Sequence, residues 1–274
     1  MNLFTPAEIV KNYSAAGRKK TEMPAFRMFI LGILSGIFIA LGAAATNTAG
    51  HSIEDVSAMR TVLGVLFPGG LTLVVLLGGE LFTGNCLICI SVLEKQAKIS
   101  GMIKNWAVVY IGNLSGSLLI AFACAKFGQM NYSEGGLAVF TMKLAAAKAS
   151  LPFANAFVLG ILCNMLVCLA VLASLSAKDT VGKVAGVFFP ICFFVICGFE
   201  HCVANMYYIP AGIFAASVPE YAAKAAEAGV NLSSLTWNGF FVGNLVPVTL
   251  GNLAGGLLVG ILMWFGHVWE KGKA

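Results

Sequence analysis

Two segments with the same spacing contain the residues of this chain that could do chemistry. Segments 78–85 and 198–205 both read Gly-x-Glu-x-x-x-x-Asn, and each interrupts an apolar stretch with polar side chains. Unsatisfied backbone is very costly in hydrocarbon, so such an interruption must be buried in protein or line a wet cavity. Two interrupted spans at corresponding positions of two half-chains point to a substrate pathway in a transport protein.

His201 lies inside the second segment and can donate, accept and titrate. Ionisable side chains within membrane spans usually serve a function, although a packing histidine bonded to a neighbour is the alternative. Thr83 occupies the first segment. Its hydroxyl could bond His201 or a permeant ion, or it could satisfy loop carbonyls as a structural threonine.

The carboxylates and amides of the two segments have a structural interpretation. Glu80 and Glu200 could accept backbone N–H groups that each interruption sets free. Asn85 and Asn205 could cap the helices that resume afterwards. The positive dipole ends of those helices would then face the middle of the membrane, which favours an anion over a cation.

The composition is that of a polytopic membrane protein. Of 274 residues, 59% are hydrophobic and only 11% are charged, whereas globular proteins have about 25% charged residues. The mean hydropathy is +0.88. The net charge of +5 therefore reflects the excess of basic residues in cytoplasmic loops. We expect the lipid bilayer as a partner and no nucleic acid.

We expect an all-α membrane protein with six spans, each near the ~20 residues that a bilayer requires. The expected spans are 28–45, 61–93 with a break at 82–85, 106–125, 151–175, one that starts near 184 and breaks at 200–205, and one that ends near 264.

Two further fragments are repeated in the same order as the interrupted segments. Residues 31–34 (Leu-Gly-Ile-Leu) recur at 159–162, and residues 112–119 (Gly-Asn-Leu-x-Gly-x-Leu-Leu) recur at 251–258. Three spans in each half place the halves in opposite orientations, so we predict a three-plus-three inverted repeat. The predicted organisation is a single channel domain, 1–274, with an N-terminal helix (1–27), a first repeat (28–126) and a second repeat (150–266).

The N-terminal segment has the signature of an amphipathic helix. Thr5, Pro6 and Glu8 form a capping box with proline in the first turn. The apolar stripe that follows predicts a helix lying at the cytoplasmic membrane surface.

The basic residues of the loops predict the orientation. Twelve fall on one side of the predicted spans: Lys11, Arg18, Lys19, Lys20, Arg27, Lys95, Lys98, Lys104, Lys178, Lys183, Lys271 and Lys273. Five fall on the other: Arg60, Lys126, Lys143, Lys148 and Lys224. Both termini should therefore be cytoplasmic in a multi-pass protein of the cell inner membrane. The longest outer loops are 131–149 and 217–238, the latter with a short helix at 219–228.

Cysteine usage leaves an enzymatic alternative open. The eight cysteines lie in or beside apolar spans and are interpreted as unpaired thiols. Cys86 and Cys89 form a CxxC motif, which is compatible with a membrane thiol redox enzyme only if a thiol is accessible and activated. A water or glycerol channel is a second alternative, but Asn-Pro-Ala turns are missing at both interruptions. We expect no enzymatic activity, no cofactor and no metal site.

These motifs resemble the formate/nitrite transporter family over essentially the whole chain. Residues 75–84 resemble its first signature, residues 160–170 its second, and Glu200, His201 and Asn205 its central histidine segment. Within the family, the chain resembles the hydrosulfide channels of clostridia. The resemblance implies an aquaporin-like protomer in a homopentamer, with a pore in each protomer.

The resemblance also implies roles for individual residues. At the pore centre it implies His201 and Thr83 opposite each other, with Asn164 facing the pore, and Lys148 in the vestibule. The implied outer constriction consists of Phe67, Leu71 and Phe194, and the inner one of Leu81, Phe82 and Val167. Support for the broken helices is implied for Glu80, Gly84, Asn85, Glu200 and Asn205.

The sequence thus predicts a passive channel for small monovalent weak-acid anions, with hydrosulfide favoured over formate and nitrite. An anion that meets two apolar constrictions faces a large desolvation penalty. Lys148 would attract the anion, and His201 would give it a hydrogen bond or a proton. The alternative is a proton-coupled formate or nitrite transporter, which differs only in whether that proton moves with the anion.

Overall fold

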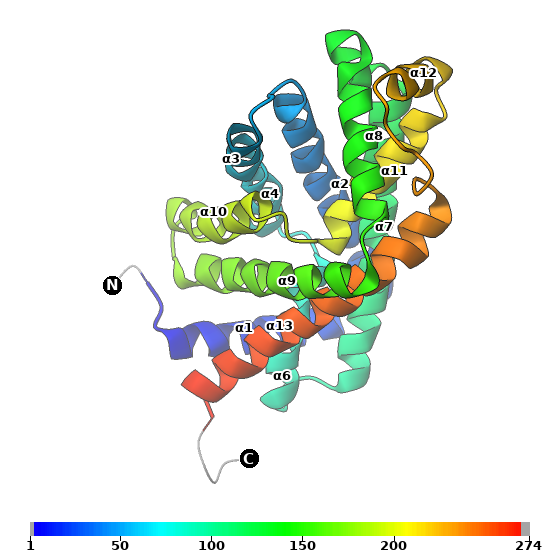
Figure 1. Ribbon diagram of the computed structural model, residues 1–274. Coiled ribbons are helices and arrows are strands. Elements are labelled where there is room, and N and C mark those ends of the chain that lie inside the picture. The colour runs from blue at the N-terminus through cyan, green and yellow to red at the C-terminus, as the bar shows by residue number, and fades with distance from the viewer. Residues whose placement is uncertain (1–2, 270–274) are drawn as a thin grey trace.

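The computed structural model describes residues 3–269, which form helices joined by turns and irregular segments, with one isolated bridge between Leu3 and Ala177 (Figure 1). The all-α prediction is confirmed. Within these residues, five helical segments are long and apolar enough to cross a membrane: Ala25–Gly50 (α2), Val56–Leu77 (α3 and α4), Ile99–Lys126 (α7), Phe153–Ser176 (α9) and Gly239–His267 (η3 and α13). The chain therefore has the helices of a multi-pass membrane protein.

The shorter apolar helices surround two interruptions of the helical backbone. They are α4 (Pro68–Leu77), α5 (Phe82–Asn85), η1 (Cys86–Ile88), α6 (Cys89–Leu93), α10 (Thr180–Ile196) and α11 (Cys202–Ala216). α4 stops before Gly78, which has φ +76°, and α10 stops before Gly198, which has φ +70°. Only glycine adopts this left-handed conformation without strain, so these two glycines end the helices.

The predicted position of the first interruption is wrong, and that of the second is correct only at residues 200 and 201. Residues 82–85 and 202–205 are helical, and the non-helical residues lie earlier, at 78–81 and 197–201. The first helix of each pair ends at a glycine with positive φ. Glu80, Glu200 and His201 lie in the non-helical residues, whereas Thr83, Asn85 and Asn205 belong to the helices that resume.

Two close helix crossings use the fragments that are repeated in the sequence. α2 packs along α7, and α9 packs along α13 (Val246–His267). A Cβ atom at Gly116 of α7 would overlap the carbonyl oxygen of Ile33, and one at Gly255 of α13 would overlap that of Ile161. Glycine at these positions lets the backbones approach closely, as small residues do between membrane helices.

The N-terminal helix, α1 (Pro6–Glu22), has the predicted capping box. The Thr5 amide donates to Glu8, and this hydrogen bond lowers the pKa of the Glu8 carboxyl. Its apolar stripe does not face lipid: Ile9, Val10 and Tyr13 are buried against the protein. The Tyr13 hydroxyl donates to the carbonyl oxygen of Gly84 at 2.9 Å, so α1 is docked on the first interruption.

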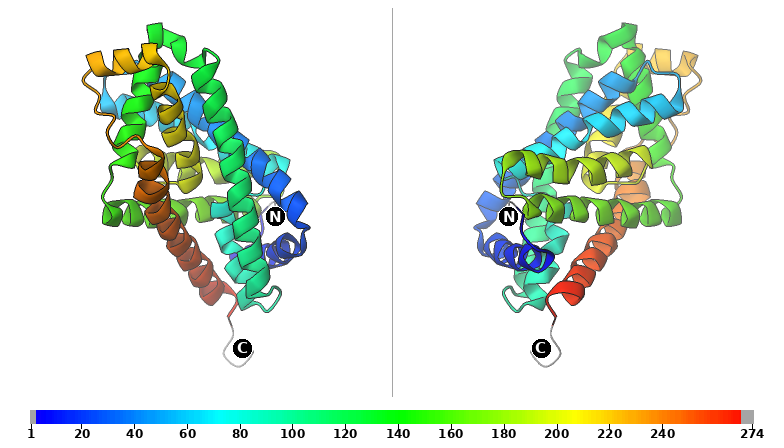
Figure 2. Two further views of the ribbon diagram at one scale, coloured as in Figure 1. Left: turned by 90° about the vertical axis from the view of Figure 1, so that its right-hand side faces the viewer. Right: turned by 90° about the vertical axis from the view of Figure 1, so that its left-hand side faces the viewer.

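The opposite end of the molecule contains a helix where the sequence predicted a loop. α8 (Gly136–Ala149) follows the irregular turn η2 (Gln129–Gly135) and packs against α11. The short helix predicted at 219–228 is present as α12 (Pro219–Glu227). Figures 1 and 2 show α8 and α12 at one end, with α1 and α6 at the other. Of the twelve basic residues assigned to the cytoplasmic side, Lys271 and Lys273 lie outside the described residues.

Candidate functional site

His201, the last residue of the second interruption, meets Thr83 of α5, the helix that follows the first interruption. The Thr83 Oγ1 lies 2.9 Å from the His201 Nε2, and both residues are buried. His201 is the N-cap of α11, and its Nδ1 accepts a hydrogen bond of 3.1 Å from the backbone amide of Ala204. In a neutral ring, the nitrogen that accepts cannot hold the proton, so Nε2–H is the donor that faces Thr83.

Asn164 supports the backbone behind Thr83. Its amide nitrogen donates to the carbonyl oxygens of Thr83 at 3.3 Å and of Asn252 at 2.6 Å. The Cys168 thiol lies 3.6 Å from the same Thr83 carbonyl. These hydrogen bonds hold Thr83 in place, and the pore-facing role that the resemblance implies for Asn164 stays a prediction.

An asparagine of α7 holds the first interruption. The Asn113 amide nitrogen donates to the carbonyl oxygens of Gly32 at 2.8 Å and Glu80 at 2.9 Å, and its Oδ1 accepts from the Phe82 amide at 2.9 Å. The Glu80 amide donates to the Leu31 carbonyl at 3.1 Å. These bonds satisfy backbone groups that the interruption leaves without helical partners.

An asparagine of α13 holds the second interruption in the same way. Asn252 donates to the carbonyl oxygens of Gly160 at 2.7 Å and Glu200 at 2.9 Å, and it accepts from the Cys202 amide at 2.9 Å. The Glu200 amide donates to the Leu159 carbonyl at 3.3 Å. Sequence reasoning missed the role of both asparagines, although the repeated Gly-Asn-Leu fragment was its signal.

Beside the first interruption, a lysine, a glutamate and two asparagines form a closed network. Glu80 accepts from the Lys20 ammonium at 2.6 Å and from the Asn85 amide at 2.6 Å. Asn85 also donates to the Asn105 Oδ1 at 2.8 Å, and Asn105 donates to the Lys20 carbonyl at 3.3 Å. α1 supplies Lys20 to this network, and the sequence analysis overlooked both Lys20 and Asn105.

The same network is repeated beside the second interruption. Glu200 accepts from the Lys148 ammonium at 2.7 Å and from the Asn205 amide at 2.6 Å. Asn205 donates to the Asn244 Oδ1 at 2.7 Å, and Asn244 of the π-helix η3 (Gly239–Leu245) donates to the Lys148 carbonyl at 2.9 Å. α8 supplies Lys148 to this network.

The roles first expected for these side chains therefore need correction. Neither glutamate uses its carboxylate for the freed backbone amides, because each carboxylate binds a lysine and an asparagine. Asn85 and Asn205 do not cap the resuming helices, because their amides bind the glutamates. The asparagines of α7 and α13 accept the first free amides of the helices that resume, and His201 is the N-cap of α11.

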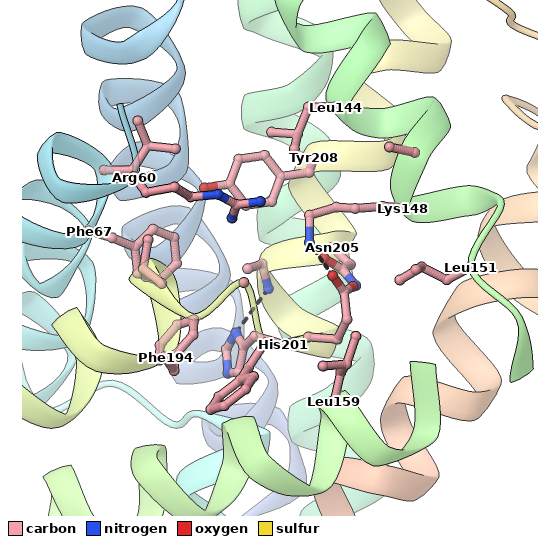
Figure 3. A pocket seen from close by; sticks show the side chains of 17 residues that line it. Arg60, Phe67, Leu144, Lys148, Leu151, Leu159, Phe194, His201, Asn205 and Tyr208 are labelled. Carbon is pink, nitrogen blue, oxygen red and sulfur yellow. Dashed lines mark hydrogen bonds and ion pairs between the residues drawn. The ribbon is translucent and has the colours of Figure 1, made fainter. Parts of the chain in front are cut away.

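Each network borders a pocket of about 210 Å³. Arg60, Phe67, Lys148, Glu200 and His201 are among the residues that line the first, which we call the α8 pocket (Figure 3). Residues that line the second, which we call the α1 pocket, include Tyr13, Lys20, Leu71, Glu80 and Leu81. The two pockets are associated with the two opposite ends of the molecule.

The apolar residues expected in the outer constriction are only partly brought together. Phe67 and Phe194 both line the α8 pocket, with ring centroids 5.5 Å apart. Phe194 also lies 5.9 Å from the His201 ring. Leu71, which was grouped with them, lines the α1 pocket.

The expected inner constriction is likewise divided. Leu81 and Gly84 line the α1 pocket. The Phe82 ring packs edge-on against Tyr110 at 4.8 Å and lines an apolar groove between α7 and α13. Val167 is buried and is not among the described residues that line either pocket.

The two thiols of the CxxC motif do not offer an accessible reactive site. Cys86 and Cys89 are 0% and 6% exposed, and both are free. A thiol redox reaction requires an accessible thiol, so their burial argues against the enzymatic alternative. Within residues 3–269, no three His, Cys, Asp or Glu side chains are gathered as a metal site would require.

Comparisons with known proteins give a consistent result. The sequence model of the family described as formate/nitrite transporter matches residues 7–265. A probable formate transporter of Methanothermobacter thermautotrophicus is 38% identical, over 97% of this chain and 98% of its own. The formate channel FocA of Escherichia coli K12 is 36% identical, over 98% of this chain and 96% of its own.

Two solved structures share the fold. One is a pentameric formate channel with formate bound, with a TM-score of 0.78 and 36% identity over 89% of this chain and 98% of that chain. The other is an ion channel of the same family, with a TM-score of 0.82 and 26% identity over 94% of this chain and 98% of that chain.

Proposed function

The chain belongs to the formate/nitrite transporter family, and on that premise we propose that it is a passive channel for small monovalent anions in the cytoplasmic membrane. The relatives are named as transporters and channels rather than enzymes. Formate is the first substrate to test because several relatives are named for it. Hydrosulfide, which the sequence analysis favoured, stays a prediction.

The contact between His201 and Thr83 carries this proposal. Both side chains are buried, and they join two interrupted helices beside the α8 and α1 pockets. An anion that leaves a pocket loses its water, which costs free energy unless hydrogen bonds replace it. The Nε2–H of His201 and the hydroxyl of Thr83 are donors that could replace it at this point.

The hydrogen bond that the His201 Nδ1 accepts favours passive conduction over proton coupling. A proton on the His201 Nδ1 would face the Ala204 amide, which already donates to this nitrogen at 3.1 Å. Two donors cannot share a hydrogen bond, so protonation would remove the N-cap of α11. The neutral ring can serve as a hydrogen-bond donor without that loss.

The architecture that we propose has six spans in two inverted repeats, 28–126 and 150–266, within one channel domain. The duplicated asparagine bonds and the duplicated lysine–glutamate–asparagine networks support it. Both termini would be cytoplasmic. By analogy with the pentameric relative, the assembly would be a homopentamer with one pore in each protomer.

Reconstitution into liposomes tests the function. Initial uptake of formate, nitrite, hydrosulfide and glycerol is compared between wild type, His201→Phe and protein-free liposomes. We expect uptake of the anions but not of glycerol by wild type, and little uptake by His201→Phe. Glycerol uptake as fast as that of the anions would contradict an anion channel. A mass other than that of five protomers in mild detergent would contradict the pentamer.

A further inference from the structure

The two pockets are alike in their networks but differ in charge. The charged residues that line the α1 pocket are Lys20 and Glu80, which form an ion pair with each other. The α8 pocket has the equivalent pair, Lys148 and Glu200, and in addition Arg60. Because each pair is neutral as a whole, the α8 pocket keeps one net positive charge and the α1 pocket keeps none.

This difference changes the interpretation of Lys148. Its ammonium lies 2.7 Å from the Glu200 carboxylate, which cancels most of its attraction for an anion at a distance. The Arg60 guanidinium makes no hydrogen bond or ion pair with another residue of the described chain. Arg60 is therefore the uncompensated cation of the α8 pocket.

Arg60 is directed into the pocket by α3 (Val56–Leu66) and by the second interruption. Its Nη1 lies 3.1 Å from the position that a Cβ atom of Gly198 would occupy, so the absent side chain leaves room for the guanidinium. Gly78, at the equivalent place in the first interruption, has nothing within 4 Å of that position. Figure 3 shows the Arg60 and Lys148 side chains entering the pocket from opposite sides, above His201.

A guanidinium with free N–H groups selects by shape as well as by charge. Its planar fork matches two oxygen atoms held by one carbon or nitrogen, and two parallel hydrogen bonds then form. A carboxylate or a nitrite has such a pair of oxygens, whereas hydrosulfide has a single acceptor atom. A pocket of about 210 Å³ holds such an anion together with several waters, each of which needs about 30 Å³.

We propose that Arg60 is the residue that captures the anion in the α8 pocket, and that it selects planar anions with two oxygens over hydrosulfide. The proposal rests on the function proposed above. Capture by Arg60 precedes the dry region at Phe67 and Phe194, where His201 supplies the next hydrogen bond. Among residues 3–269, none that lines the α1 pocket is equivalent to Arg60, so capture is stronger from the α8 side.

Three variants separate capture by shape from capture by charge. Arg60→Gln removes the charge, and Arg60→Lys keeps the charge without the fork. Lys143→Gln is the matched control, because it removes an exposed positive charge from the same helix as Lys148 without lining the α8 pocket. For each variant, initial uptake into proteoliposomes is measured over a range of formate and hydrosulfide concentrations. Hydrosulfide is used at alkaline pH, with uptake by protein-free liposomes subtracted.

We expect Arg60→Gln to raise the half-saturating formate concentration about tenfold, as the loss of a charge-assisted bidentate contact would. The hydrosulfide value should rise about threefold or less, Arg60→Lys should be intermediate for formate, and Lys143→Gln should match wild type. Equal shifts for both anions, or no shift for formate, would overturn the proposal and leave the channel function intact. Wild-type liposomes that take up neither anion would instead overturn the proposed function.

A binding measurement keeps the proposal testable if a variant is assembled but transports poorly. Formate should raise the melting temperature of the detergent-solubilised wild type and of Lys143→Gln, since a ligand of the folded state stabilises it. Arg60→Gln should show a much smaller rise at the same formate concentration. A rise in Arg60→Gln equal to that of wild type would overturn capture by Arg60.

Discussion

Asn113 and Asn252 make the same three hydrogen bonds at two places where the helical backbone stops. Each side chain donates to a carbonyl of a neighbouring helix and to the carbonyl of a glutamate, and each accepts the first free amide of the helix that resumes. Each asparagine thereby satisfies three backbone groups in an environment without water. The candidate pathway therefore depends on two residues that do not line it.

Replacing Asn252 by leucine should destabilise the protein strongly. The variant leaves the buried Glu200 carbonyl and Cys202 amide without this partner, and each unpaired group costs about 1–3 kcal/mol. The melting temperature in detergent, followed by size-exclusion fluorescence, should fall clearly below that of wild type. Asn12→Leu, at an exposed position of α1, is the control and should melt like wild type. A wild-type melting temperature for Asn252→Leu would contradict the structural role.

Replacing Lys148 alone should be more harmful than replacing Lys148 and Glu200 together. Lys148→Gln leaves the buried Glu200 carboxylate, 3% exposed, without its cation, and breaking a buried pair costs about 3–5 kcal/mol. It also cancels the positive charge of the α8 pocket, so anion uptake should fall steeply. The double variant with Glu200→Gln should recover most of the melting temperature. A double variant no more stable than the single one would argue against this pair.

The His201→Asn variant should keep the N-cap of α11 but lose the proposed hydrogen bond to the anion. Asparagine is a good N-cap and can still accept from the Ala204 amide, but its shorter side chain cannot reach Thr83 as the ring does. We expect a folded protein in which anion uptake is lowered about tenfold, because one hydrogen bond to the charged anion is lost. If conduction is passive, wild type and His201→Asn should have parallel pH profiles once uptake is corrected for the anion fraction. A rise on acidification confined to wild type would support the proton-coupled alternative.

The proposed topology places Ser233 and Thr180 on opposite sides of the membrane. Both are exposed, so Ser233→Cys and Thr180→Cys can be labelled with a membrane-impermeant thiol reagent in intact cells. Cys197 is exposed and is replaced by serine in the background, which is also the unlabelled control. Only Ser233→Cys should react from outside. Labelling of both from the same side would exclude inverted repeats with cytoplasmic termini.

Much of the helical framework could be read from the sequence because it depends on local and repeated patterns. Long apolar stretches predicted membrane helices, since only helices satisfy their own backbone in lipid. The capping box at Thr5 and Glu8 was also correct, because both partners lie within one turn. A hydrogen bond between Thr83 and His201 was one of the alternatives that their positions in the two interrupted segments allowed, and it is the one present in the structure.

The partners of the polar side chains depended on contacts between distant segments. Lys20 and Glu80 are sixty residues apart, and nothing local indicates that α1 brings them within 2.6 Å. The sequence analysis placed the interruptions at the polar residues, whereas the helices end next to the glycines with positive φ, Gly78 and Gly198. Leu71 lines the α1 pocket and Phe82 lines the groove between α7 and α13, and hydropathy could not indicate this because it does not encode the direction of an apolar side chain. The constriction roles of both residues stay predictions.

The sequence by itself determined a membrane protein of paired helical fragments with polar interruptions, and it identified the family. Only the tertiary structure decided which charges remain uncompensated. Lys148 and Arg60 are both basic residues in the sequence. In the folded chain, Lys148 forms an ion pair with Glu200, whereas Arg60 lines the α8 pocket without such a partner among the described residues. An ionic attraction depends on the distance to every neighbouring charge, and those distances exist only once the chain is folded.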